Sequence, residues 1–119
     1  MANRPISPAT HGLIDYGLGV VNTVGPRLLG LQGKAAMIAA VTALAHVSLN
    51  ALTDQRYAVR RIIPFQGHRA AETVGVPALI VTALATGVLK EPRARLFYGG
   101  LFLALGTVYA LTDWNATPE

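Results

Sequence analysis

The sequence predicts an all-α protein, a four-helix transmembrane bundle built from two tandem two-helix repeats. Hydrophobic residues make up 52% of the chain, and residues 35–53, 73–89 and 96–112 carry no formal charge at neutral pH. A helix needs about 20 residues, with a range of about 17–25, to cross the hydrocarbon layer of a bilayer. Charged residues make up only 13%, against about 25% in soluble domains. Short motifs also recur in the two halves of the chain.

A soluble bundle of buried helices is the competing interpretation. The surface helices of such a bundle show a polar stripe that repeats every 3.6 residues. Residues 35–53 and 73–89 contain no charged stripe, so helices built from them would have almost no surface suited to water. The membrane interpretation therefore takes precedence, and membrane lipid is the first expected partner.

The first helix is predicted for residues 8–31. Ser7 followed by Pro8 is typical of a helix start, because the serine side chain accepts a hydrogen bond from the first turn and proline lacks an N–H that would need a partner. This segment also carries charged residues, so it is the least apolar of the four. The Gly25-Pro26 pair predicts a kink near its end.

The other helices are separated by turn and loop sequences. Residues 54–67 are predicted to form a connecting loop, because arginines and a proline interrupt them. Trp114 follows the last helix, at the position where an aromatic side chain at the membrane interface is expected. The remaining predicted helices are residues 35–53, residues 68–89 with a kink at Pro77, and residues 92–112.

Two pairs of short motifs place equivalent residues in the two halves. His11-Gly-Leu-Ile-Asp15 opens the first half and His68-Arg-Ala-Ala-Glu72 opens the second, while Leu52-Thr53-Asp54 and Leu111-Thr112-Asp113 close them. The offset between matched residues changes by only two between the two motif pairs. We therefore expect one integral membrane domain over residues 1–119, with repeats at about 8–54 and 68–113. Each repeat would cross the membrane twice, which makes the repeats parallel and places both termini on one side.

Several of these segments also carry a family resemblance. They are His11-Gly-Leu-Ile-Asp15-Tyr16, Pro26-Arg27-Leu28-Leu29-Gly30, Leu52-Thr53-Asp54, and Ile63-Pro64 followed by His68 and Glu72. In them the chain resembles the small bacterial integral membrane proteins with SPW-type two-helix repeats. The chain departs from that family's pattern, since Gly25-Pro26-Arg27 stands where Ser-Pro-Trp is expected. The resemblance implies a membrane location and a repeat, and no defined activity.

Six titratable residues are expected to gather on the face that holds both termini. A functional interpretation is a ligand or metal site, or a proton path, because carboxylates inside a membrane are costly and histidines with carboxylates suit a first-row transition ion. The structural interpretation is ion pairing, in which the two carboxylates at the helix C-termini are paired by Arg56, Arg60, His68 or Arg69. The six residues are His11, Asp15, Asp54, His68, Glu72 and Asp113.

His46 lies near the middle of a predicted apolar helix, where a polar side chain is expensive. A single neutral histidine there is a possible axial ligand for a haem or a chlorophyll-type pigment. The repeat offset places Leu105 at the equivalent position, which argues against two histidines on one haem. The alternative is a hydrogen bond to a neighbouring helix, through Ser48, Tyr109 or a backbone carbonyl.

Other chemistries lack their residues. The chain has no cysteine, which excludes disulfides and thiol catalysis, and it contains no phosphate-binding loop and no serine-nucleophile motif. The formal charge of +4 comes without a basic stripe or interleaved aromatics, so we expect contacts with anionic lipid headgroups and no nucleic acid.

The expected location is the bacterial inner membrane. Residues 1–10 lack the apolar core of a cleavable signal peptide. The ten Lys and Arg residues divide evenly between the two expected sides, although the Arg56, Arg60 and Arg61 cluster slightly favours cytoplasmic termini.

The leading functional expectation is a non-catalytic accessory or interaction subunit, acting as a homo-oligomer or with other membrane proteins and without a cofactor. The alternative is a small transporter or channel, or a membrane protein that binds a metal or pigment through the polar cluster or His46. Enzyme activity would rest on the same six residues.

Overall fold

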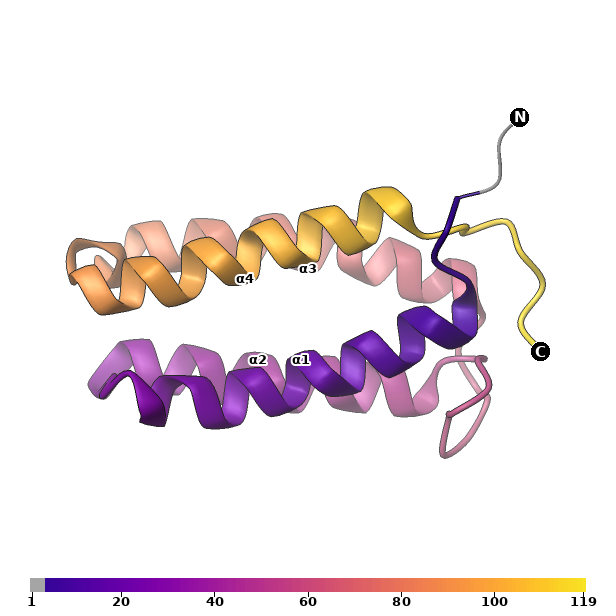
Figure 1. Ribbon diagram of the computed structural model, residues 1–119, viewed down its shortest axis with the longest axis horizontal. Coiled ribbons are helices and arrows are strands. Elements are labelled where there is room, and N and C mark those ends of the chain that lie inside the picture. The colour runs from indigo at the N-terminus through magenta and orange to yellow at the C-terminus, as the bar shows by residue number, and fades with distance from the viewer. Residues whose placement is uncertain (1–3) are drawn as a thin grey trace.

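The computed structural model describes residues 4–119 and consists of four long helices (Figure 1). They are α1 (Pro8–Leu28), α2 (Gly33–Leu52), α3 (Phe65–Ala85) and α4 (Pro92–Leu111), with a short 3₁₀ helix, η1 (Val88–Lys90), before α4. Residues 4–119 contain no β-strand, only two isolated bridges. The prediction of an all-α protein with four helices is therefore confirmed.

The helix ends agree with local sequence signals. Ser7 caps α1 as predicted, since its side chain accepts a hydrogen bond from the backbone N–H of Thr10. The first and third helices end earlier than predicted because Gly30 and Gly87 follow their last turns with φ of +68° and +78°. Glycine adopts this conformation without steric cost and commonly terminates helices. Helix α3 begins earlier than predicted, at Phe65, directly after Pro64.

The helices pair as α1 with α2 and α3 with α4, and the start of α1 lies at the same end of the bundle as the end of α4 (Figure 1). Two isolated bridges tie the halves together at this end. Ile6 pairs with Thr112, and Thr53 pairs with Ile63. Each bridge joins the segment that precedes one helix pair to the end of the other pair. We call this end, with its buried polar side chains, the polar end.

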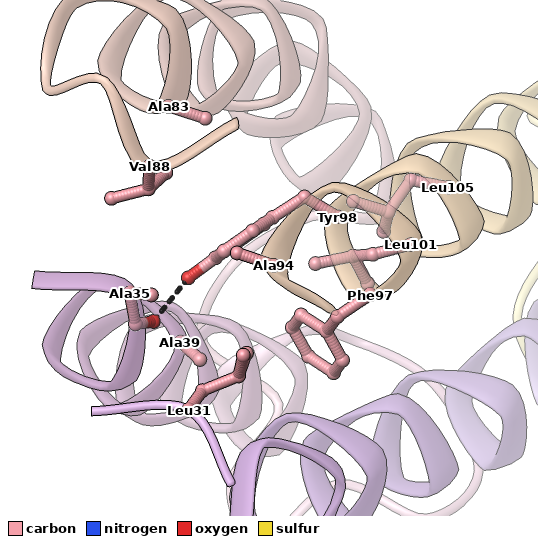
Figure 2. Packing of buried hydrophobic residues seen from close by; sticks show 10 residues of the cluster. All are labelled: Leu31, Ala35, Ala39, Ala83, Val88, Ala94, Phe97, Tyr98, Leu101 and Leu105. Atoms are coloured by element: carbon pink, nitrogen blue, oxygen red, sulfur yellow. Dashed lines mark hydrogen bonds between the residues drawn. The ribbon is translucent and has the colours of Figure 1, made fainter. Parts of the chain in front are cut away.

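The opposite end of the bundle holds the apolar packing and is called the apolar end. Figure 2 shows Tyr98 reaching from α4 to α2, where its hydroxyl donates to the backbone carbonyl of Ala35 at 2.5 Å. Phe97 packs edge-on against Tyr98, with ring centroids 5.1 Å apart. The buried cluster comprises Leu31, Ala35, Ala39, Ala83, Val88, Ala94, Phe97, Tyr98, Leu101 and Leu105.

The outward faces of the helices are rich in large apolar side chains. Leu28, Leu44 and Leu103 are each more than 70% exposed. Helices α2 and α4 are long and apolar enough to cross a membrane, and only 17% and 28% of their most apolar stretches are buried inside the bundle. Within residues 4–119, α1 and α3 are long enough, at 21 residues each, but do not reach that apolarity.

Candidate metal centre

Five side chains from three helices converge at the polar end. Helix α1 contributes His11 and Asp15, α3 contributes His68 and Glu72, and α2 contributes His46. In α1 and α3 the histidine and the carboxylate are separated by four residues, which places them on one helix face. The three helices therefore direct nitrogen and oxygen atoms to one point.

The distances within this cluster fall in a narrow range. The Nε2 atoms of His11, His46 and His68 lie 3.1, 3.2 and 3.0 Å from Oδ2 of Asp15. The same three atoms lie 3.3, 3.5 and 3.1 Å from Oε1 of Glu72. Each histidine nitrogen is thus close to both carboxylates, and each carboxylate oxygen is close to all three histidines.

Two threonines fix the orientation of two of the histidine rings. The hydroxyl of Thr53 donates to a backbone carbonyl of its own helix at 2.6 Å and lies 2.8 Å from Nδ1 of His68. The hydroxyl of Thr112 makes the same two contacts, at 2.5 Å with its own helix and 2.8 Å with Nδ1 of His11. A hydroxyl has one proton to give, so in both pairs Nδ1–H of the histidine is the donor.

When such a ring is neutral, its proton is on Nδ1 and its Nε2 atom carries a lone pair. The Nε2 atoms of His11 and His68 lie only 3.3 Å apart, and both face ionisable carboxylates. Lone pairs and negative oxygens at such separations repel one another unless a positive charge lies between them. The cluster therefore requires cations, either protons on the histidines or a metal ion.

The spacing matches the coordination shell of a single ion. Two ligand atoms that each lie about 2.1 Å from one ion, at an angle of about 90–120°, stand about 3.0–3.6 Å apart. The histidine-to-carboxylate distances run from 3.0 to 3.5 Å. One ligand atom from each of His11, Asp15, His68 and Glu72 lies within 4.8 Å of every other. His11, Asp15, His68 and Glu72 are thus close enough together to hold one ion, and Nε2 of His46 lies beside both carboxylates.

The cluster is shielded from solvent and leaves polar atoms without hydrogen bonds. Asp15 is fully buried, and neither of its carboxylate oxygens has a hydrogen-bond partner among residues 4–119. Within the same residues, Nε2 of His46 also lacks a hydrogen bond. Buried polar atoms are normally paired, so these atoms require either protons on the facing histidines or a bound cation.

Aromatic rings cover the outer side of the cluster. The ring of Trp114 lies 4.9 Å from that of His11 and 5.0 Å from that of Phe65. Trp114 is only 3% exposed, so its ring lies inside the protein and not on its outer surface. Its indole N–H donates to the backbone carbonyl of Tyr109 at 3.0 Å. Trp114 packs over the site instead.

The structure brings together four of the six residues that the sequence placed in the polar cluster, namely His11, Asp15, His68 and Glu72. Asp54 lies outside and pairs with Arg61 at 3.4 Å, with its side chain 42% exposed. Arg61 was not among its expected partners. The carboxylate of Asp113 accepts a hydrogen bond from the backbone N–H of Asn115. These two carboxylates sit at helix ends without contributing to the centre.

His46 also belongs to the cluster, although the sequence predicted a separate role for it. Its Nε2 faces Asp15 and Glu72; the hydrogen bonds expected with Ser48 or Tyr109 are not among the contacts of the described residues. A haem or chlorophyll-type ring on this nitrogen would require the imidazole to turn away from both carboxylates, so the geometry favours a small ion. The sequence motifs that close each half contain Thr53 and Thr112, but they do not predict that these threonines contact His68 and His11.

A groove leads from the outside of the bundle to this cluster. It runs between α2 and α3, has a volume of about 610 Å³, and includes His46 and Glu72 among its lining residues. Apart from these two and two threonines, the lining residues are apolar or glycine. The centre is therefore closed on its outer side by aromatics and approached laterally along an apolar path.

The arrangement consists of three imidazole nitrogens and two carboxylate oxygens, buried in a helical bundle and oriented by hydroxyl groups. Such a donor set suits divalent first-row transition ions. No protein-family model, no curated protein and no solved structure matches this chain.

Proposed function

We propose that this protein is an integral membrane four-helix bundle that binds one divalent first-row transition ion through His11, Asp15, His46, His68 and Glu72. The observation that carries the proposal is the convergence of three histidine Nε2 atoms on the same two carboxylate oxygens, at 3.0–3.5 Å. Accessory or interaction roles within a membrane complex are compatible with it, because a structural ion would serve them.

Protonated histidines are the main alternative to a metal. An Nε2–H group that lies near both carboxylates must share its proton between two oxygens, and His11 and His68 are placed in this way. Protonation of both His11 and His68 would also place two N–H groups on atoms 3.3 Å apart. One ion between these groups would contact atoms of His11, Asp15, His68 and Glu72 together, with His46 beside both carboxylates, which favours the metal.

The membrane location is supported by the outer surface of the bundle. A core helix of a soluble protein is mostly buried, whereas α2 and α4 bury only 17% and 28% of their most apolar stretches. Large side chains such as Leu44 and Leu103 point outward. These surfaces suit hydrocarbon. We propose the inner membrane as the location, with all four helices crossing it and both termini on one side.

Matched contacts support a duplicated two-helix unit. Thr53 and Thr112 each join a histidine of the other half to the end of their own helix. The N–H of Asp54 donates to the carbonyl of Ile63 at 2.7 Å, and that of Asp113 donates to the carbonyl of Ile6 at 2.8 Å. A pseudo-two-fold axis through the centre would relate these pairs, as in other membrane proteins built from repeats. We include the similarity to proteins with SPW-type two-helix repeats in the proposal of a duplicated unit.

The test is the metal content of protein purified in mild detergent without chelators. We expect about one equivalent of a transition metal per chain, and loss of the metal in Asp15→Asn because the substitution removes an anionic ligand. The matched control is Asp54→Asn, which removes a carboxylate outside the cluster and should leave the metal content unchanged.

Two outcomes would overturn the proposal. One is a folded protein that neither contains a transition metal nor binds one when Zn²⁺ or Co²⁺ is added to it. The other is equal loss of metal in both variants, which would place the ion away from the cluster. Extraction of the protein by carbonate without detergent would separately contradict the membrane location.

A further inference from the structure

The groove between α2 and α3 has apolar walls. Met37 and Val41 line it from α2, and Ala78 and Leu79 line it from α3. The two threonines in the wall offer no free proton. Thr42 and Thr82 donate their hydroxyl protons to backbone carbonyls of their own helices at 2.7 and 2.8 Å. Any molecule along the groove would therefore meet mainly hydrocarbon.

The groove becomes polar where it reaches the metal centre. His46 and Glu72 line it there, and both belong to the cluster. The 3.5 Å between Nε2 of His46 and Oε1 of Glu72 is the longest of the histidine-to-carboxylate distances. A five-coordinate ion can accept a sixth ligand, and this wide edge is the direction from which an atom in the groove would approach it.

The charge of the centre selects the kind of group that fits. Two carboxylates and one divalent ion sum to zero when the histidines are neutral, which is the state in which a histidine binds a metal ion. An uncharged oxygen, from a hydroxyl or a carbonyl, can ligate the ion without leaving a net charge in a low-dielectric site. The volume of about 610 Å³ lies within the range of about 300–1,000 Å³ typical of small-molecule sites.

We propose that the groove binds an uncharged, single-chain lipid-soluble molecule, whose terminal hydroxyl or carbonyl oxygen ligates the ion beside His46 and Glu72. Its hydrocarbon chain lies between α2 and α3. This inference rests on the proposed metal centre and on lateral access from the membrane, and it names the class of molecule that the centre would receive.

The test uses protein loaded with Co²⁺ in phosphatidylcholine nanodiscs, because the visible absorption of Co²⁺ responds to its ligands. Addition of 1-dodecanol should change the Co²⁺ spectrum in a saturable way, whereas dodecane, which has no oxygen, should not. Dodecanoate tests the charge preference, and we expect it to bind more weakly than the alcohol.

A variant that fills the groove gives the second arm. Gly75 lines the groove, and a Cβ atom added there meets no atom within 4 Å, so Gly75→Leu should fold and bind Co²⁺. It should weaken the response to 1-dodecanol by about tenfold or more, since a misplaced methyl or methylene group in a pocket costs about that much. Gly99→Leu on α4 is the matched control, because the space at Gly99 is also open and the residue does not line the groove.

The outcomes separate this inference from the proposal on which it rests. Absence of any Co²⁺ spectrum would overturn the metal centre. A normal Co²⁺ spectrum that does not respond to 1-dodecanol, that responds equally to dodecane, or that responds more strongly to dodecanoate would overturn the lipid inference alone. A dimer of the wild-type protein that Gly75→Leu converts to a monomer would overturn it too, because a second copy would then occupy the groove.

Discussion

The interior of the bundle is filled by different kinds of side chain at its polar and apolar ends. At the apolar end, Phe97, Tyr98 and Leu101 fill the space between the helices (Figure 2). At the polar end, His11, Asp15, His68 and Glu72 occupy the equivalent interior. Burial of apolar side chains and their dispersion contacts stabilise a fold without any ligand. Burial of charges does so only when they are fully paired.

This difference indicates that the apolar end stabilises the fold and that stability alone does not explain the polar end. If residues were selected for stability alone, the polar end would be filled like the apolar end. Replacing a buried ionic cluster by apolar residues of similar size is often neutral or stabilising. The polar cluster is therefore the part of the interior that stability does not explain. The packing at the apolar end supports the helices that carry the side chains of this cluster.

The largest effect is expected for Phe97→Ala at the apolar end. The ring is 8% exposed, and its removal leaves a cavity that should cost about 3 kcal/mol of the free energy of unfolding. Thermal unfolding in one fixed detergent measures this change. Metal affinity of the folded fraction should not change; loss of metal affinity in folded Phe97→Ala would contradict the separation of the two ends.

An intermediate effect is expected for Thr53→Val and Thr112→Val at the polar end. Each removes the hydroxyl that orients one histidine ring while keeping the shape of the side chain. Loss of such a supporting contact typically lowers metal affinity by about 10–100-fold, which competition with a chromogenic chelator measures.

Tyr98→Phe is the matched control for the two threonine variants. It also removes a buried hydroxyl hydrogen bond, to the carbonyl of Ala35, and should cost about 1 kcal/mol of stability without changing metal affinity. If Tyr98→Phe weakened metal binding as much as Thr53→Val, the threonines would have no specific role in orienting the histidines.

The smallest effect is expected for Glu91→Gln, at the start of α4. The Glu91 carboxylate accepts hydrogen bonds from the backbone N–H groups of Arg93 and Ala94 at 3.0 and 2.8 Å, which hold the pKa of that carboxyl below its usual value. A lowered pKa in the folded state contributes stability above the pKa of the unfolded chain, and this contribution disappears as the pH falls through the lowered value.

The wild-type protein should therefore be slightly more stable than Glu91→Gln at pH 7, and the difference should vanish in acid. Melting temperatures of both proteins between pH 7 and pH 3 check this. A difference that grows as the pH falls would contradict the helix-capping role. Because the group is exposed, added salt should reduce the effect.

The helices of the bundle could be predicted from the sequence because the signals are local. Ser7 and Pro8 predict the start of α1, whereas the first and third helices end a few residues before their predicted ends, because Gly30 and Gly87 terminate them. Helix α3 starts at Phe65, before its predicted start at residue 68. The prediction placed Pro64 and the residues after it in the loop, but a helix can begin directly after a proline. Such signals fix where each helix lies within a few residues.

The centre could be predicted only in part, because it depends on how the helices rotate about their axes. The spacing within His11–Asp15 and His68–Glu72 places each pair on one helix face, and this was visible in the sequence. No pattern along α2 shows that His46 faces the same point. Asp54 and Asp113 shared the expected side with the cluster, yet they lie at helix ends and make contacts outside it.

The buried polar cluster draws on every long helix: α1, α2 and α3 supply its histidines and carboxylates, and Thr112, directly after α4, contacts His11. Neither helical hairpin alone contains more than two of the histidines. The last of the four helices thus completes the support of the cluster. An ion held there would cross-link the two hairpins, and separation of the hairpins would release it.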